Sequence, residues 1–450
     1  MSQGLAGRGI GAVATLAGAF GWLALASSAV VNPVTLEWLL RDRAIAMKQV
    51  AFSFSCWSFS LGLSLVVVSL VTRRLNAKHQ LICARLSILL VSIAGIVLVD
   101  RLLLVSIGRP MWIADRENHY SHRPNAERRW SEKLGSKPIR LNRFGHHDDD
   151  FEAHKPAGEF RGLVLGDSIV MGHGVTRDEA FPNRIEDRLE TMLTRDRSVQ
   201  IVNTGVQGYS TFQLLNTLRR SLVFDPDIVV VGFYLNDVSE PFVVNRRFGG
   251  VGLDYHGVLQ TRAWFLSWLA NESGFGRMVQ QFQRPEKRRQ LRENWSKYAG
   301  QVVARADRDD PRISEGWDLV LNSLTSIFDL AEEHGIPVVL VVFPDTAQLA
   351  WPEAQQPQRI VGALAARRKV PVVDLTPVFE DLIFDPVATE ILLQRGFAVD
   401  EIQDLHSQRT RKYFLDSDHY TPEGHEIVAE RLVPVIVQSC PGRFLERDSS

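Results

Sequence analysis

Five short runs made almost entirely of valine, isoleucine and leucine recur along the chain after residue 160. They are GLVLG (162–166), VQIVN (199–203), DIVVVGFYL (227–235), IPVVLVVFP (336–344) and VPVVDL (370–375). Continuous apolar runs of this length are typical of parallel strands covered on both faces, and helical patterns such as 179–193 and 317–334 lie between them. The alternation predicts an α/β domain with a doubly wound parallel sheet. Functional groups gather at the carboxyl ends of the strands in such sheets.

An insertion at 238–315 interrupts this alternation. Trp264 and Trp268 lie four positions apart, so a helix would present them on one face, and a basic stretch covers 284–297. The insertion has the character of a lid, a glycan-contacting surface or a helix lying on a membrane surface. A cap that only packs its own aromatic side chains explains it equally well.

The N-terminal quarter of the chain has a different character, because long apolar runs dominate it. These runs cover 9–31, 50–71 and 85–107. The first two carry no charge, and each is long enough to cross a bilayer, which takes about 20 apolar residues. The third contains Asp100 and Arg101, and ionised groups are costly inside a span. We therefore expect 1–109 to be a membrane region with two or three transmembrane helices.

Residues 110–160 are rich in charge and are expected to form a polar connector. The cluster at 146–150, two histidines followed by three aspartates, offers metal-ligating groups. Adjacent side chains in a loop rarely converge on one ion, so a solvated charge run is the better interpretation.

Charge and cysteine content exclude some classes of protein. The formal net charge is −1, which gives no indication of a nucleic-acid partner. The three cysteines, Cys56, Cys83 and Cys440, have neither the spacing of a disulfide framework nor that of a metal site. Cysteine usage therefore does not determine the cellular compartment.

The stretch VLGDSIVMGHGV, 164–175, runs from a predicted strand directly into a helical pattern. Serine and aspartate both favour helix N-caps, so Ser168 could serve only to cap the helix. It could instead be a nucleophile, because a helix N-terminus directs backbone N–H groups toward developing negative charge. A nucleophile would also need a histidine base, a carboxylate that orients the base, and an oxyanion hole.

Three later stretches supply such residues at the ends of predicted elements. VNTGVQGYST (202–211) contains Gly208, and GFYLND (232–237) contains Asn236, whose amide can donate to an oxyanion. FLDSDHYTPEGHEIVAERL (414–432) places Asp416 three residues before His419, ahead of a helix with proline in its first turn. Together these residues favour the nucleophile interpretation.

In this order the four blocks resemble the SGNH (GDSL) hydrolase family over about 161–437. The resemblance implies a three-layer αβα domain at 161–440. It implies that Ser168 is the nucleophile, His419 the general base and Asp416 its orienting partner. The backbone N–H groups of Ser168 and Gly208 and the side chain of Asn236 would form the oxyanion hole. No metal or organic cofactor is implied.

Some positions leave alternatives open. Tyr234 stands where the family has glycine, and it either narrows the acyl pocket or is accommodated by the strand. Gly205 competes with Gly208, and Asp418 competes with Asp416. The remaining candidates near the blocks, His173, His425 and Cys440, are expected to be structural or inert.

GEFRGLVLGDS, PDIVVVGFYLND and HYTPEGH are similar to a bacterial branch that is often membrane-anchored and associated with envelope polysaccharides. We expect a multi-pass inner-membrane protein with a periplasmic catalytic domain. As a serine esterase it would remove acyl groups, such as acetyl, from a glycan or lipid-linked substrate beside polysaccharide-assembly proteins. An O-acyltransferase that uses the same residues and a non-catalytic polysaccharide-assembly anchor remain as alternatives. The numbers of basic residues beside the apolar runs favour neither side of the membrane.

Overall fold

The computed structural model describes most of the chain from residue 77 onward. The described residues are 77–193, 198–238, 247–248, 251–253, 259–261, 264–278, 311–395 and 398–444. The chain divides into two compact units, one comprising Met1–Arg109 with Ala263–Pro285 and the other comprising Pro110–Arg262 with Glu286–Ser450. Part of the predicted insertion thus groups with the N-terminal unit.

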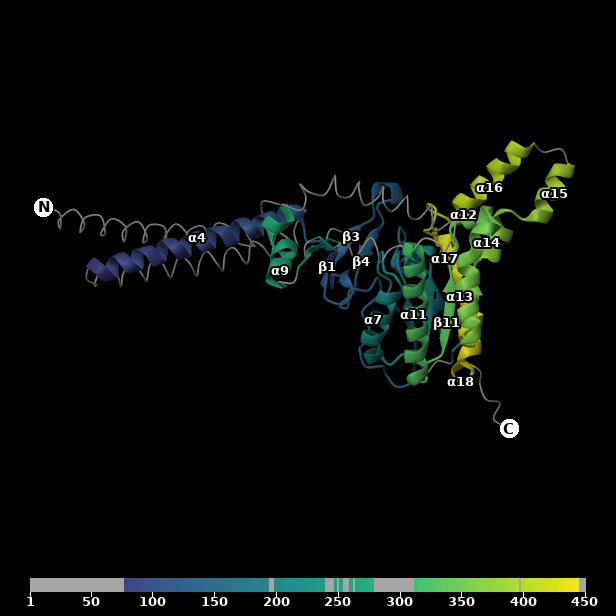
Figure 1. The fold of residues 1–450 in the computed structure, drawn as a ribbon, viewed down its shortest axis with the longest axis horizontal. Coiled ribbons are helices and arrows are strands. Elements are labelled where there is room, and N and C mark those ends of the chain that lie inside the picture. The colour runs from purple at the N-terminus through teal and green to yellow at the C-terminus, as the bar shows by residue number, and fades with distance from the viewer. Residues whose placement is uncertain are drawn as a thin grey trace. The chain divides into compact units, whose positions relative to one another are not determined.

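The described part of the N-terminal unit includes the long helix α4 (Ala77–Ile107) and the short helix α9 (Trp264–Glu272) (Figure 1). Just after α9, the backbone N–H of Phe275 donates to Asp100 Oδ1 at 3.1 Å. This bond gives one charged residue of the third apolar run a partner within its own unit. Both helices expose large apolar side chains, including Leu89 and Trp268.

Among the helices that the structure describes, none combines the length and the hydropathy expected of a transmembrane helix. The run 85–107, expected as a third span, lies inside α4, and the structure does not support it as a span. The runs 9–31 and 50–71 lie outside the described residues.

A five-stranded sheet forms the centre of the second unit. Its strands are β5 (Glu159–Leu165), β6 (Ser198–Asn203), β7 (Ile228–Phe233), β11 (Val338–Val342) and β12 (Val372–Asp374). Their order is β12-β11-β7-β5-β6, and all neighbours are parallel. The five predicted strands and their parallel arrangement are confirmed. The direction of winding reverses between β5 and β7, which is where sheets of this type place their sites.

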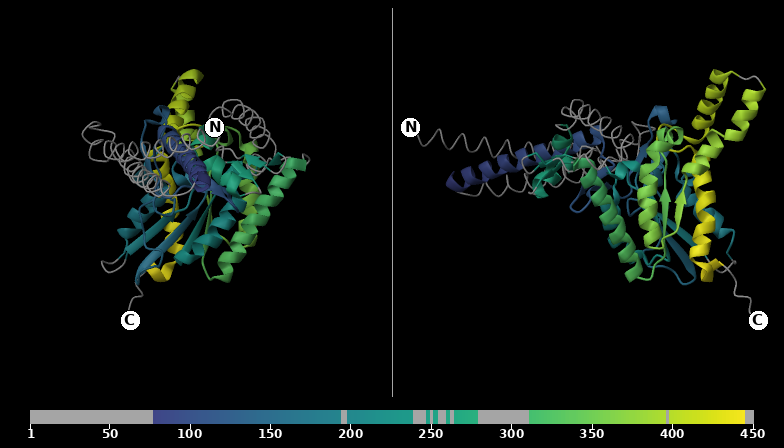
Figure 2. Two further views of the ribbon diagram at one scale, coloured as in Figure 1. Left: turned by 90° about the vertical axis from the view of Figure 1, so that its left-hand side faces the viewer. Right: turned by 45° about the vertical axis from the view of Figure 1, so that its right-hand side comes forward.

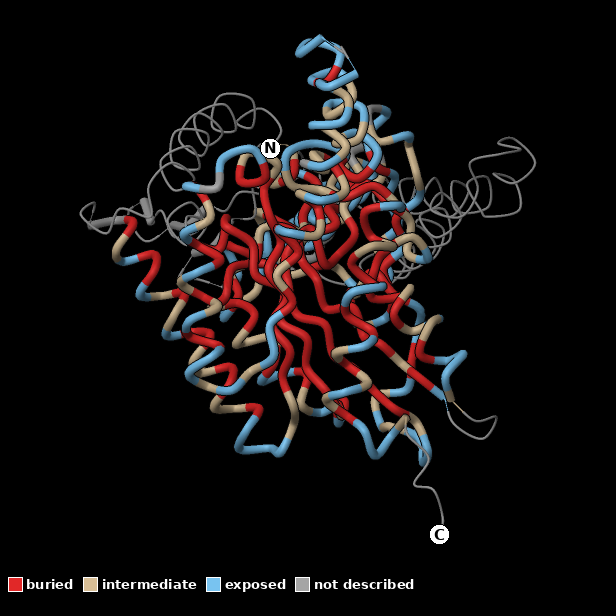
Figure 3. Tube along the Cα trace, turned by 90° about the vertical axis from the view of Figure 1, so that its right-hand side faces the viewer, coloured by how far each residue is buried: buried red, intermediate tan, exposed pale blue. Residues whose placement is uncertain are grey.

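Helices cover both faces of this sheet, as the pattern predicts (Figure 2). They are α6 (Phe181–Glu190), α7 (Thr211–Ser221), α11 (Pro311–Glu333), α13 (Gln356–Arg367) and α17 (Pro422–Ser439). On one face α11 packs against α7 and α13, and on the other α17 packs against α6. The strands β5, β7 and β11 are almost continuously buried, whereas the edge strand β12 is partly exposed (Figure 3). This enclosure explains why the strands read as unbroken apolar runs rather than alternating ones.

The segment 110–160, expected as a polar connector, is folded into the same unit. It forms the hairpin β1 (Trp112–Asp115) with β2 (His119–His122), and the hairpin β3 (Glu127–Arg129) with β4 (Pro138–Arg140). The fully buried Tyr120 donates its hydroxyl to the Gln207 carbonyl at 2.9 Å. We call residues 110–150 the strap, because they lie across the elements that follow β5 and β6.

The charged cluster at 146–150 is only partly a solvated run. His147 and Asp148 are buried, whereas the next two aspartates are exposed. Asp148 accepts hydrogen bonds from the backbone N–H of Asn203 at 3.0 Å and from the Asn183 amide at 3.1 Å. The buried carboxylate therefore attaches the strap to the end of β6, a contact that no local sequence pattern predicts.

Short elements complete the second unit. The helices are α5 (Ser168–Met171), α12 (Thr346–Ala350), α14 (Thr376–Ile383), α15 (Pro386–Gln394), α16 (Val399–Tyr413) and α18 (Pro441–Phe444). The 3-10 turns are Glu132–Leu134, Arg177–Glu179, Leu222–Phe224, Leu235–Val238 and Pro352–Gln355. An antiparallel ribbon is formed by β8 (Arg247–Phe248), β9 (Val251–Leu253) and β10 (Leu259–Thr261).

Candidate active site

The junction between β5 and α5 shows whether Ser168 is needed as a helix cap. Asp167, not Ser168, caps the helix, because its Oδ1 accepts from the backbone N–H of Ile169 at 2.9 Å. Gly166 permits the tight turn, since a Cβ there would lie 2.0 Å from Val170 Cγ2. The hydroxyl of Ser168 is therefore not needed for capping and is available to another partner.

That partner is His419, although 251 positions separate the two residues along the chain. Ser168 Oγ lies 2.9 Å from His419 Nε2. On the other side of the ring, His419 Nδ1 lies 2.9 Å from Asp416 Oδ2 and 3.0 Å from its Oδ1. The structure thus brings together the three residues predicted for nucleophile, base and orienting carboxylate. This arrangement can transfer the serine proton to the imidazole.

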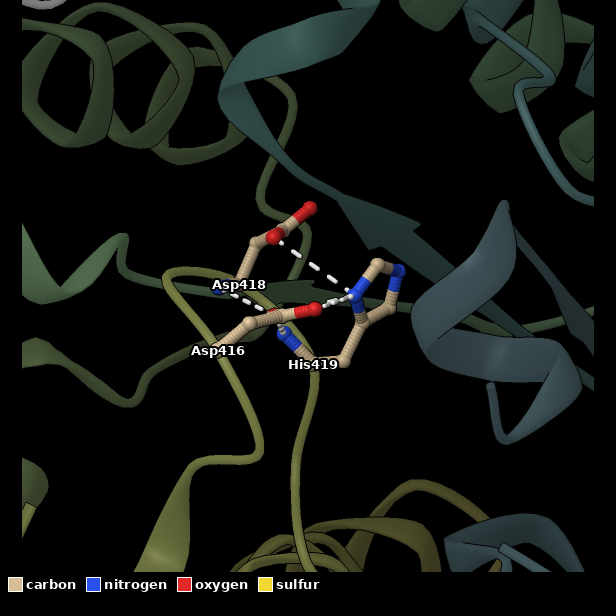
Figure 4. A group of neighbouring side chains, drawn as sticks. All are labelled: Asp416, Asp418 and His419. Atoms are coloured by element: carbon tan, nitrogen blue, oxygen red, sulfur yellow. Dashed lines mark hydrogen bonds and ion pairs between the residues drawn. The ribbon is translucent and has the colours of Figure 1, made fainter. Parts of the chain in front are cut away.

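Asp416 rather than Asp418 is the nearer partner of the imidazole (Figure 4). Asp418 Oδ1 lies 3.5 Å from His419 Nδ1, beyond ordinary hydrogen-bond distance. Asp416 Oδ1 also accepts from the backbone N–H groups of Asp418 at 3.1 Å and His419 at 2.8 Å, which fixes the carboxylate in place.

Electrostatics in this loop favour a basic histidine beside an ionised Asp416. Burial acts to lower the pKa of His419, but the charges of Asp418 and Asp416 and the hydrogen bond to Asp416 outweigh it and raise that pKa. Burial acts to raise the pKa of Asp416, yet hydrogen bonds from His419 lower it. Burial raises the pKa of Asp418. The pKa values of the two carboxyl groups are therefore shifted in opposite directions, and Asp416, which lies nearer to the ring, is the more acidic.

Hydrogen bonds and a short bridge hold the loop at 415–419, here called the catalytic loop, in place. The Leu415 N–H donates to the His419 carbonyl at 2.8 Å, and Phe414 pairs with Tyr420 as an antiparallel bridge. Immediately afterwards, Thr421 caps α17, accepting from the Gly424 N–H at 3.2 Å. The predicted anchoring of this loop by the following helix is confirmed.

Three donors predicted for the oxyanion hole follow three adjacent strands. Ser168 follows β5, Gly208 follows β6 and Asn236 follows β7. Among the described residues, none accepts a hydrogen bond from the backbone N–H of Ser168 or Gly208. The Asn236 amide donates to Asp167 Oδ2 at 2.9 Å, which holds it beside the nucleophile. The arrangement can present N–H groups to a developing oxyanion.

The structure gives Gly205 and Gly208 different roles. The Gly205 N–H already donates to Asn203 Oδ1 at 3.1 Å, and a Cβ there would lie 2.2 Å from the backbone nitrogen of Met171. Gly205 is thus required for close packing. Gly208 has a φ of 72°, a left-handed conformation that favours glycine.

The end of β7 accommodates Tyr234, the residue that departs from the family pattern. Its side chain is buried, and its hydroxyl donates to Asp345 Oδ2 at 2.8 Å. Asp345 caps α12, and the next residue, Thr346, donates its N–H to the Ser417 carbonyl at 2.9 Å. Tyr234 therefore connects the asparagine block with the catalytic loop, a role that the motif alone does not reveal.

The remaining candidates have structural environments. His425 is fully buried in α17, where its Nδ1 lies 3.3 Å from the Phe181 nitrogen, and burial lowers its pKa to about 3. Burial raises the pKa of Cys440 to about 11, which suppresses its thiolate. His173 lies against the ring of His419, and sequence reasoning missed this contact.

A metal is the other chemistry that the loop could support. Asp416, Asp418 and His419 form the one group in the described part of the chain whose potential ligand atoms all lie within 4.8 Å of one another. However, both ring nitrogens of His419 already lie at hydrogen-bond distance from partners, one from Asp416 and the other from Ser168. This geometry fits proton transfer better than metal ligation.

Comparison with known proteins identifies a protein family and several solved structures that match much of the chain. The family described as "GDSL-like Lipase/Acylhydrolase" matches residues 164–427, more than half of the chain. Among solved structures, TesA shares 15% identity and a TM-score of 0.33, covering 61% of this chain and 97% of its own. A catalytic mutant of Axe2, an acetylxylan esterase from Geobacillus stearothermophilus, shares 14% identity and a TM-score of 0.33, covering 62% and 94%. No curated protein sequence matches the chain.

Proposed function

This chain belongs to the GDSL-like lipase/acylhydrolase family and is an ester-bond hydrolase, and on that premise we propose that Ser168 is its nucleophile. His419 is the general base, and Asp416 orients and stabilises it. The observation that carries this proposal is the continuous hydrogen-bonded path from Ser168 Oγ through His419 to Asp416.

In the first half-reaction, Ser168 Oγ attacks the ester carbonyl carbon while its proton passes to His419 Nε2. The carbonyl oxygen becomes an oxyanion that accepts from the N–H groups of Ser168 and Gly208 and from the Asn236 amide. The tetrahedral intermediate collapses, the C–O bond to the alcohol breaks, and the alcohol leaves with the proton from His419. The acyl group stays on Ser168.

In the second half-reaction, water takes the place of the alcohol. His419 removes a proton from the water as it attacks the acyl carbon, and then returns that proton to Ser168 Oγ as the carboxylic acid departs. The negative charge of Asp416 stabilises the imidazolium in both steps. The raised pKa of His419 suits a base that must hold this proton transiently.

The molecule on which this site is proposed to act is an acylated glycan or a lipid-linked substrate of the bacterial envelope, with O-acetyl groups among its acyl esters. The charge-free runs 9–31 and 50–71 support attachment to the inner membrane. Similarity of the motif blocks to an envelope-associated branch supports an extracytoplasmic catalytic unit and polysaccharide-assembly proteins as partners. The basic stretch 284–297 would suit anionic headgroups or glycans.

The proposal is tested with the full chain in detergent, an alkyl fluorophosphonate probe and an O-acetylated glycan. We expect the probe to label the wild-type chain and not Ser168→Ala, and the wild type to release acetate from the glycan. Labelling of both proteins would disprove the assignment of the nucleophile. Labelling of the wild type without acetate release would leave the nucleophile in place and disprove this substrate class.

A further inference from the structure

His173 lies directly beside the proposed base. It follows α5, where Gly172 and Gly174 on either side of it have φ values of 81° and 87°. Its backbone N–H donates to the Ser168 carbonyl at 2.9 Å, so its position is tied to the nucleophile. A Cβ at Gly174 would lie 2.5 Å from Leu415 Cδ1 in the catalytic loop, which shows how closely the two segments approach.

The ring of His173 is in contact with aromatic rings on two sides. Its centroid lies 4.2 Å from that of His419 at an interplanar angle of 32°, and 4.5 Å from that of Trp130 at 56°. Trp130 belongs to the strap, and its indole N–H donates to the Val175 carbonyl at 2.9 Å. The strap therefore supports His173, which in turn covers one side of His419.

The neighbours of His173 favour its neutral form. The Gln207 amide contacts His173 Nδ1, so that this nitrogen accepts and the ring proton resides on Nε2. Its neighbours Gln207 and Trp130 are uncharged, and the ionisable groups that face it are His419 and Asp416. Burial and the positive charge of His419 lower the pKa of His173 to about 3, although Asp416 opposes this.

We propose that His173 is a positioning residue. Its ring packs against the His419 imidazole and keeps that imidazole aligned with Ser168. The inference rests on the proposed function and adds a residue outside the nucleophile, base and carboxylate set. This neighbouring ring, tilted by 32° to that of His419, restricts rotation of the base and keeps water from one side of it. Small misplacements of reacting groups can cost about a hundredfold in rate, so such support is valuable.

The experiment compares His173→Ala, which removes the ring, with His173→Phe, which keeps a flat ring but has no ring nitrogen. His406→Ala serves as the matched control, because His406 lies on α16 and contacts Phe384 and Thr389 rather than the proposed base. The measurement is the second-order rate of fluorophosphonate labelling of the full chain between pH 5 and pH 9, roughly spanning the histidine range. Thermal melting verifies that each variant is folded.

We expect the His173→Ala variant to be labelled about tenfold more slowly than the wild type. The acid limb of its pH profile should move to higher pH. The upward shift is expected because water admitted beside His419 relieves the burial that lowers its pKa. His173→Phe should retain the acid limb of the wild-type profile and about a third or more of the wild-type labelling rate, since a flat ring remains. His406→Ala should match the wild type.

An alanine variant whose rate and profile superimpose on those of the wild type would overturn the positioning role. So would a folded phenylalanine variant that is as impaired as the alanine variant, because the ring itself would then not be what matters. A wild-type chain that is not labelled at any pH would overturn the proposed function and this inference with it.

Discussion

Asn236 donates its side-chain amide to Asp167 Oδ2 at 2.9 Å, so the residue preceding the nucleophile holds a predicted oxyanion donor. The other oxygen of Asp167 caps α5. Burial raises the pKa of this carboxyl group, and hydrogen bonds from Ile169 and Asn236 oppose the shift. One buried side chain thus connects the helix that carries Ser168 with the end of β7.

The coupling predicts non-additive effects of substitution at these two positions. Asn236→Ala should lower kcat for a short acyl ester about a hundredfold with little change in KM, as the loss of an oxyanion donor does. Asp167→Ala should also lower kcat, because Asn236 loses its support. The double variant should fall short of the product of the two single effects in steady-state kinetics. A change confined to KM in Asn236→Ala would assign this residue to substrate binding instead.

Ser168→Ala should abolish hydrolysis of the same ester, with kcat reduced by about three orders of magnitude or more. The hydroxyl bonds to His419 and does not cap α5, so the fold should persist. Kinetics together with thermal melting tests both statements. Turnover near that of the wild type would exclude the proposed mechanism.

Substitution of the two loop aspartates should identify the orienting carboxylate. Asp416→Asn should reduce kcat by about 10³ to 10⁴, because the ring would lose the partner that fixes its tautomer. Asp418→Asn serves as the matched control and should have a far smaller effect, since its oxygen lies 3.5 Å from the ring nitrogen. Equal losses in the two variants would contradict the assignment made from the distances.

The pH profile follows from the shift at His419. The base must be neutral to accept the serine proton, so kcat/KM should fall as the pH drops through the His419 pKa. Because that pKa is raised, the fall should occur above the ordinary histidine value of 6.5. Asp418→Asn removes a neighbouring negative charge and should move the fall to lower pH. A wild-type profile that remains flat well below 6.5 would show that a raised His419 pKa does not control the reaction.

Reporter fusions test the proposed side of the membrane. A reporter active only in the periplasm, fused after Ser450, should be active, and a cytoplasm-specific reporter at the same site should be silent. The expectation follows from the proposed envelope substrate, which lies outside the cytoplasm. The opposite pattern would place the substrate inside the cell.

The type of sheet and the places where chemistry could occur follow from local patterns in the sequence. Apolar runs such as 227–235 predict buried parallel strands, because a strand covered on both faces needs no polar residues. Gly208 and Asn236 could be predicted because each lies just after such a run, where side chains reach the carboxyl edge of the sheet. These are local signals, visible within a few residues of one another.

Packing was needed to choose between candidates that the local sequence left open. Asp167 rather than Ser168 caps the helix, and Asp416 rather than Asp418 is the nearer partner of His419. The strap likewise resembles a polar connector in sequence, and its Trp130 contacts the ring of His173. Each outcome depends on hydrogen bonds or ring contacts fixed by packing. Partners as far apart as Ser168 and His419 meet only because the sheet brings separate strand ends and loops together.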